Sequence, residues 1–211
     1  MNRNFIFRKQ LFFYTLLFTT LSILAQDSND GWKLSKSKDG IKVYTRIPEG
    51  SKFKEYLAET TVQASPEQLV KVLKDVDHYT DWMAHIKSAR LIKEDGKDEF
   101  YVYSEISVPW PFNNRDEVTK TVVSKDESSG TYNIFIVMIP DMLPENKGVV
   151  RMPEGKGKWV IEPVKDGMTQ IVNQFIGDPG GSIPSWVVNM FIVDGPYKTL
   201  EGLKEILGQG E

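Results

Sequence analysis

The sequence predicts an α+β domain in which antiparallel strands are followed by one long C-terminal helix. Short runs with strand patterning follow one another from residue 89 to 176, and turn signals such as Asp95-Gly96 separate them. A stretch of helical periodicity then runs from Ile183 to Leu207. Successive strands with short connections favour an antiparallel meander.

The first elements are expected between residues 27 and 87. Residues 27–38 are polar and predict a loose or partly helical lead-in, while 41–44 and 53–62 read as short strands. Ser65-Pro66-Glu67-Gln68 predicts a helix start, because serine is a favoured N-cap, proline suits the first helical position, and glutamine completes a capping box. Residues 79–87 are rich in large side chains and predict a short, irregular helical stretch.

Seven further strands and the last helix complete the predicted fold. The strands are expected at 89–94, 99–108, 115–124, 131–139, 148–152, 156–163 and 168–176. We interpret Ser182 as the N-cap of the last helix, and Pro196 should kink or interrupt that helix. The helix holds more apolar residues than one amphipathic stripe requires, so several should face a second apolar surface.

The N-terminal segment predicts export. Three basic residues precede an apolar run from Leu11 to Leu24 that ends at Ala25, which is typical of a signal peptide over residues 1–25. A membrane anchor is the alternative, but the run is short and contains hydroxyl residues. The mature protein, residues 26–211, would be a single soluble domain in the periplasm or outside the cell.

Composition excludes several classes of function. The chain has no cysteine, which rules out disulfides, a thiolate nucleophile and a cysteine zinc site. Removing three basic and no acidic residues with the signal peptide would take the formal charge from −3 to −6, which argues against nucleic-acid binding. His78 and His85 lack the further ligands that a metal site needs, and Ser182 lacks the surroundings of a nucleophile elbow. We therefore expect no metal and no cofactor.

Glu105 and Arg115 flank the turn Pro109-Trp110-Pro111-Phe112, so a hairpin there would place an acid and a base face to face. One interpretation is an exposed ion pair of little energetic value. The other is a polar pair inside an apolar cavity, where it would orient a ligand. Met142 and Leu143, at the tip of the loop 140–147, predict either a lid or a contact that folds back onto the core.

Several motifs, in order along the chain, resemble the START lipid-transfer domain from about Trp32 to Leu207. The most specific stretch is Pro144-Glu145-Asn146-Lys147-Gly148-Val149-Val150-Arg151, followed by Trp159 and Pro163. The resemblance also includes the stretches Gly40-Ile41-Lys42-Val43-Tyr44, Gly96-Lys97-Asp98, Asn114-Arg115-Asp116, Asp178-Pro179-Gly180-Gly181 and Ile183-Pro184.

The resemblance implies a helix-grip fold, in which a curved antiparallel sheet wraps the long C-terminal helix and leaves an internal hydrophobic tunnel for one lipid. It places Glu105 and Arg115 in that tunnel on neighbouring strands, and it favours the cavity interpretation of the pair. Asp116 should point to the opposite face of the sheet. The full set of residues expected to contact the ligand is Tyr103, Glu105, Arg115, Met142, Leu143, Val187, Met190 and Phe191.

The expected function is that of an exported, monomeric carrier that binds a hydrophobic lipid, touches membranes transiently and catalyses no reaction. An enzyme of the same superfamily, similar to polyketide cyclases or a hydrolase, is the alternative, with Tyr103, Glu105 and Arg115 as acid and base candidates. An interaction module with a filled core is a third. An exported bacterial protein would put a sterol ligand in doubt and leave phospholipids, fatty acids, hopanoids or isoprenoids.

Overall fold

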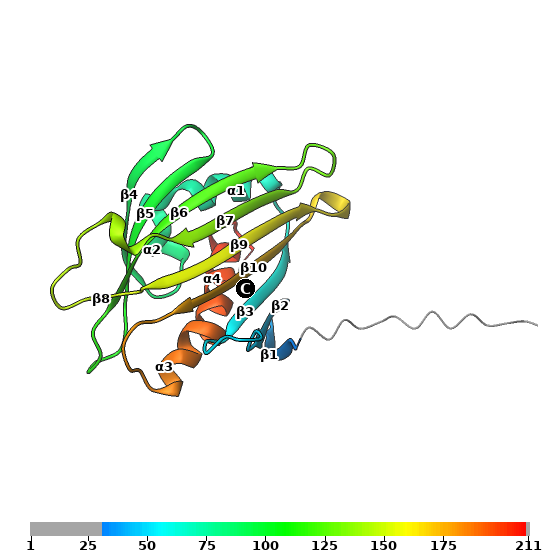
Figure 1. Cartoon of the computed structure of the whole chain (residues 1–211). Coiled ribbons are helices and arrows are strands. Elements are labelled where there is room, and N and C mark those ends of the chain that lie inside the picture. The colour runs from blue at the N-terminus through cyan, green and yellow to red at the C-terminus, as the bar shows by residue number, and fades with distance from the viewer. Residues whose placement is uncertain (1–30, 210–211) are drawn as a thin grey trace, which may run out of the picture. The chain divides into compact units, whose positions relative to one another are not determined.

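A curved, largely antiparallel sheet dominates residues 31–209, the part of the chain that this computed structural model describes (Figure 1). Its strands are β1 (Lys33–Lys38), β2 (Ile41–Arg46), β3 (Glu55–Val62), β4 (Ile86–Asp95), β5 (Glu99–Ile106), β6 (Arg115–Lys125), β7 (Tyr132–Met138), β8 (Val150–Arg151), β9 (Glu154–Pro163) and β10 (Thr169–Asp178). The expected signal peptide, residues 1–25, lies outside the described residues.

The order across the sheet is β1-β2-β3-β10-β9-β7-β6-β5-β4, and the two-residue β8 pairs in parallel with β6. The predicted antiparallel meander over residues 89–176 is correct for β4, β5, β6, β7, β9 and β10, and it is wrong for β8, which leaves the order and pairs with β6. Before the meander, β3 pairs with β10 rather than with β4. The chain leaves β3 through helix α1 (Pro66–Lys74), a 3₁₀ turn (Val76–His78) and helix α2 (Tyr79–Trp82), and returns at the opposite edge of the sheet. The closing strand β10 joins the two halves.

The C-terminal helix lies against the concave face of this sheet (Figure 1). It consists of α3 (Ser185–Asn189), a π-helical turn (Met190–Asp194) and α4 (Gly195–Ile206). Pro196, in the first turn of α4, follows the π turn directly and explains it, because a proline ring cannot sit against the carbonyl four residues before it in a regular helix. The expected interruption at Pro196 is confirmed.

The core lies where α4 and α1 pack on the strands. Leu200 and Leu203 of α4 are completely buried, as are Leu69 of α1 and Ile161 of β9. Gly202 brings α4 close to α2, since a Cβ at this position would clash with the Trp82 carbonyl oxygen. These contacts confirm an α+β fold in which a curved sheet grips the last helix.

The predicted start of α1 is confirmed, because its capping box depends only on residues close together in sequence. Ser65 accepts a hydrogen bond from the Gln68 backbone N–H, and the Gln68 side chain accepts one from the Ser65 N–H, which forms the expected capping box. The lead-in was wrong for residues 33–38, which form the lysine-rich edge strand β1. Ser182 is not an N-cap, because α3 begins after Pro184 without a side-chain cap.

Three minor 3₁₀ turns complete the described chain, at Val76–His78, Pro140–Met142 and Lys165–Gly167. Among residues 31–209, no helix combines the length and apolar character needed to cross a membrane.

Candidate functional site

A cavity of about 640 Å³ lies between the concave face of the sheet and the C-terminal helix. Its walls come from strands β3, β5, β6, β7, β9 and β10, from the C-terminal helix, and from the segment 83–86, which leads into β4. Apolar side chains supply much of the surface, among them Val102, Ile106, Ile134, Ile136, Phe175 and Ile192. This volume falls within the range of about 300–1,000 Å³ that is usual for small-molecule sites.

A stripe of polar residues crosses one wall of the cavity. Arg115, Glu117, Thr119 and Thr121 occupy alternate positions of β6 and all line the cavity, because alternate residues of a strand share one face. Sequence reasoning found Arg115 but missed the rest of the stripe. The alternation itself was the available signal, since stepping by two from Arg115 reaches each of the other three residues.

Glu117 is the most unusual of these residues. Ser104 of β5 lies opposite it across the ladder. Burial, with a smaller contribution from the charge of neighbouring Asp116, raises the pKa of the Glu117 carboxyl to about 7. Glu117 therefore changes its charge near neutral pH inside a largely apolar cavity.

Arg115 is almost fully buried at 4% exposure, and its contacts are to backbone. Its Nε donates to the Pro179 carbonyl at 3.2 Å, Nη1 to Asn113 at 2.7 Å and Nη2 to Gly180 at 3.2 Å. The guanidinium thereby joins the β5–β6 turn to the bend that leads into α3. Burial lowers the pKa of Arg115. An arginine guanidinium nevertheless keeps its charge in folded proteins, so a cation borders the cavity.

The expected Glu105–Arg115 pair does not form. The ladder places Glu105 opposite Asp116 and Arg115 opposite Ile106, so the acid and the base lie on opposite faces of the sheet. The physical reason is the turn, whose centre falls between Trp110 and Pro111 and shifts the register by one residue. Glu105 instead accepts hydrogen bonds from Lys87 at 2.9 Å and Asn114 at 2.7 Å, outside the cavity.

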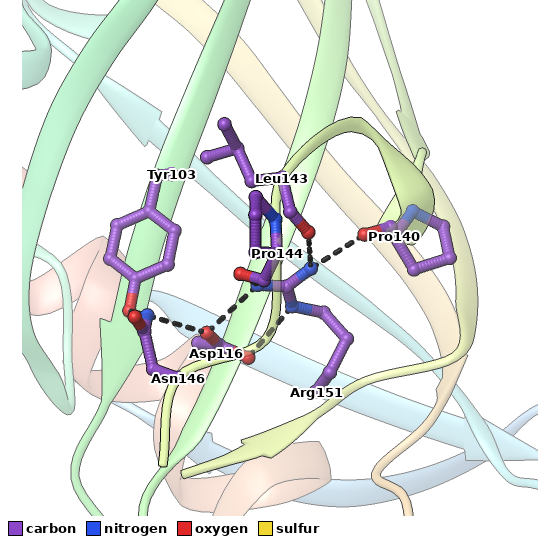
Figure 2. Close-up of polar contacts among 7 residues, drawn as sticks. All are labelled: Tyr103, Asp116, Pro140, Leu143, Pro144, Asn146 and Arg151. Atoms are coloured by element: carbon purple, nitrogen blue, oxygen red, sulfur yellow. Dashed lines mark hydrogen bonds and ion pairs between the residues drawn. The ribbon is translucent and has the colours of Figure 1, made fainter.

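Asp116 points to the opposite face from Arg115, as expected, and there it binds Arg151 (Figure 2). Arg151 Nε and Nη2 contact the two Asp116 oxygens at 2.8 and 3.1 Å, and both side chains are buried. The remaining Arg151 N–H groups donate to the carbonyls of Pro140, Leu143 and Pro144. All five guanidinium donors are thus used, and they hold the loop between β7 and β8 against the sheet.

This loop and Tyr103 belong to the outer face. Asn146 donates to the Tyr103 hydroxyl at 2.9 Å and to Asp116 at 3.3 Å (Figure 2). Among the described residues, Tyr103, Met142 and Leu143 are not part of the cavity wall. The prediction that these three residues contact a ligand inside the cavity is therefore wrong for this geometry.

The helix contributes its own side chains to the cavity. Phe191 lines it, as expected, and its ring stands edge-on to His85 with the centroids 6.1 Å apart. Val187 is fully buried, and neither it nor Met190 is part of the cavity wall. His85 also borders the cavity, and its buried Nε2 has no hydrogen-bond partner among the described residues. Burial lowers the pKa of His85.

A curved sheet that grips a C-terminal helix around an apolar cavity agrees with the comparison to known families. The START domain family model matches residues 18–209. The chain belongs to the START domain family. The match includes the last eight residues of the expected signal peptide, 18–25, and runs through the last described residue.

Relatives of this START domain include proteins of bacteria and mammals. An uncharacterized protein of Pseudomonas aeruginosa is 38% identical over 181 residues, which are 86% of this chain and 87% of that protein. The phosphatidylcholine transfer protein of Mus musculus is 28% identical over 163 residues, 75% of each chain.

Solved START structures show the same fold. A STAR-related lipid transfer protein from Xanthomonas axonopodis superposes with a TM-score of 0.78 at 39% identity, over 85% of this chain and 100% of that chain. Human StAR-related lipid transfer protein 5 superposes with a TM-score of 0.75 over 87% of this chain and 89% of that chain. Its 21% identity supports the fold alone.

Proposed function

We propose that this START domain binds one lipid in the cavity between sheet and helix and carries it through an aqueous compartment. The observation that carries the proposal is the cavity of about 640 Å³ with a largely apolar wall and a polar stripe on β6. Apolar burial would hold the acyl chains, at roughly 25 cal/mol per Å² removed from water. The polar stripe would orient the head group.

The relatives support a phospholipid as the ligand class. The similar mouse protein is named for the transfer of phosphatidylcholine, and the similar Xanthomonas axonopodis protein for lipid transfer. The names of these relatives also favour a carrier over an enzyme. The alternative of catalysis by Tyr103, Glu105 and Arg115 loses support, because the first two side chains lie on the outer face of the sheet.

One observation keeps an enzyme as the second candidate. A carboxyl with a pKa of about 7 inside a cavity is suited to general acid–base chemistry, and Glu117 is such a group. Turnover of a bound lipid would distinguish the two functions. A carrier returns the lipid unchanged after hours in the cavity, whereas an enzyme releases an altered product.

We further propose that the protein acts outside the cytoplasm, in the periplasm or extracellular space, and touches membranes transiently. The charged start and apolar run of residues 1–25 support export. Trp110 supports membrane contact, because it is 91% exposed at the tip of the β5–β6 turn, and tryptophan favours the membrane–water interface. Phe112 in the same turn packs against Trp186 of α3 with ring centroids 6.0 Å apart.

The decisive experiment is native mass spectrometry of the protein purified from its host without detergent, with extraction of the lipid that accompanies it. We expect one lipid per chain. A protein that is empty and also takes up no lipid from vesicles would contradict the carrier function. N-terminal sequencing of the same sample checks export, since cleavage after Ala25 would leave Gln26 first.

A matched pair of variants tests whether the lipid occupies this cavity. Ile136 of β7 lines the cavity, whereas its neighbour Val137 is 46% exposed on the outer face. Ile136→Trp should fill space that the lipid needs and reduce uptake at least tenfold, while Val137→Trp should leave uptake unchanged. Equal uptake by the two variants would place the lipid elsewhere.

A further inference from the structure

Glu117 lines the cavity inside the protein, and its carboxyl has no polar partner in the part of the chain that the structure describes. No hydrogen bond or ion pair joins its carboxyl to another described residue. Two tyrosines lie near enough for the charge of Glu117 to raise their pKa, but their hydroxyl groups donate to other acceptors. Tyr56 donates to Asn173 at 2.9 Å, and Tyr79 donates to the Leu73 carbonyl at 2.6 Å.

Arg115, the neighbouring cation, does not donate a hydrogen bond to Glu117 either. Arg115 lies two positions before Glu117 on the same strand face, a separation of about 7 Å. Each of its three guanidinium nitrogens donates to a backbone carbonyl of the turns that flank the cavity. The two side chains therefore present opposite charges to the cavity without neutralising each other in a direct pair.

A buried carboxylate without a donor is costly, and the cost is removed when a cation that donates hydrogen bonds binds it. Because Glu117 lines the cavity, a ligand bound there can supply such a donor. A ligand head group with an ammonium toward Glu117 and an anion toward Arg115 would complement both charges. Phosphatidylethanolamine, a zwitterion whose primary ammonium has three N–H donors, has this chemistry.

We propose that Glu117 selects lipids whose head group carries a primary ammonium, so that the cavity prefers phosphatidylethanolamine to anionic phospholipids. This inference rests on the proposed carrier function and assigns Glu117 as the residue that sets head-group specificity. A quaternary ammonium has the charge but no N–H donor, and it satisfies the carboxylate less well. A ligand that donates from a neutral hydroxyl would not need a negatively charged residue in the cavity.

The same carboxyl makes selection dependent on pH. Protons compete with the ammonium for Glu117, whose pKa burial raises to about 7. Affinity for phosphatidylethanolamine should therefore fall toward tenfold per pH unit below about 7. The other titratable groups on the cavity wall are Lys52, Lys54, Tyr56, Tyr79, His85, Arg115 and Asp178.

Of these groups, His85 is the one whose titration most needs to be distinguished from that of Glu117. Its pKa is lowered from the ordinary 6.5, and its protonation would add positive charge to the cavity at acidic pH. Asp116, next to Glu117 in sequence, faces the other side of the sheet and is paired with Arg151. Replacing Glu117 alone thus distinguishes the two titrations, because His85 remains in the variant.

To test this, the purified protein is incubated with mixed vesicles of phosphatidylcholine, phosphatidylethanolamine and phosphatidylglycerol. The three lipids carry acyl chains of different mass, so that native mass spectrometry identifies which one is bound. The wild type should take up phosphatidylethanolamine over phosphatidylglycerol. Glu117→Gln, which keeps the shape and removes the charge, should reduce that preference about tenfold and flatten its pH profile. Glu162→Gln, an exposed change of the same charge on β9, should behave as wild type.

Two outcomes would overturn the inference: a Glu117→Gln protein that keeps the wild-type preference, or a wild type that prefers phosphatidylglycerol. A pH slope retained in the variant would assign the titration to His85 instead and would also overturn it. The wild-type pH profile gives a reading that does not depend on the variant's folding. Uptake of no lipid at all would contradict the carrier function, whereas uptake without an effect of Glu117→Gln contradicts this inference alone.

Discussion

Glu117 and Glu105 show how one residue of strand register separates an interior carboxyl from a surface one. Glu105 faces the outer side, where Lys87 and Asn114 hold it, and these contacts lower its pKa. Glu117 faces the cavity, where burial raises its pKa to about 7. Both are glutamates on adjacent strands, so the difference arises from the face of the sheet and not from the residue type.

Glu117 should make the empty protein less stable as the pH rises. Its folded pKa of about 7 lies above the ordinary 4.5, so the folded state binds more protons between these values. Stability present below pH 4.5 is then lost as the pH rises through 7, by about 3 kcal/mol in total. Glu117→Gln should remove this loss, which urea unfolding of lipid-free protein at pH 5 and pH 8 would reveal. Parallel pH profiles for variant and wild type would contradict the assignment.

At the scale of elements, the Asp116–Arg151 pair connects strands β6 and β8 with the loop between β7 and β8. The pair is buried, it is held by two hydrogen bonds, and Arg151 also holds three loop carbonyls. The loop that carries Met142 and Leu143 therefore has a defined anchor on the outer face. Opening it would require breaking a charge-assisted network rather than a few apolar contacts.

Arg151→Met should destabilise the protein by about 3–5 kcal/mol, because it leaves the Asp116 carboxylate buried without a partner. Hydrogen exchange in the segment 140–147 should increase as well, since three carbonyl contacts are lost. Lys147→Ala, an exposed change in the same loop, serves as the control. If the double variant Arg151→Met with Asp116→Leu were no more stable than Arg151→Met, the unpaired carboxylate would not be the cause.

At the scale of the whole molecule, the curved sheet and the C-terminal helix line the cavity together, and the β5–β6 turn lies beside the start of that helix. Arg115 joins the β5–β6 turn to the bend before α3, and the Phe112–Trp186 contact joins the same turn to α3 itself. Movement of the helix would therefore disturb the turn that carries Trp110. This connection places an exposed aromatic side chain beside the elements that would part when a lipid enters.

Trp110→Ala should slow lipid transfer between vesicles by about tenfold, as expected for the loss of roughly 1.4 kcal/mol of membrane contact. The amount of lipid bound at equilibrium should not change, because Trp110 is outside the cavity wall. Phe135→Ala removes a 51% exposed ring from the outer face of β7 and is the matched control. Equal transfer rates for the two variants would exclude the turn from membrane contact. Replacing Met142 and Leu143 with aspartate tests the loop in the same assay.

The chain's local chemistry determined much of the fold. The capping box at Ser65 and Gln68, the strand alternation from residue 86 to 178 and the interruption at Pro196 each depend on neighbours a few residues apart. The ordered motifs of the family could likewise be read from the sequence. The edge strand β1 escaped prediction, because its polar residues are supported by pairing with β2 and not by an apolar pattern of their own.

Tertiary structure alone decided the site. The register of β5 on β6 separated Glu105 from Arg115, and the pairing of β10 with β3 joined strands β1–β3 to the rest of the cavity wall. The same register placed Glu117 inside the cavity. Tyr56, Tyr79 and Arg115 donate to other groups, so Glu117 has no hydrogen-bond donor among residues 31–209. Sequence sets the alternation of side chains along each strand. Which alternate set faces inward, and which partners remain for it, depends on pairings between residues far apart in the chain.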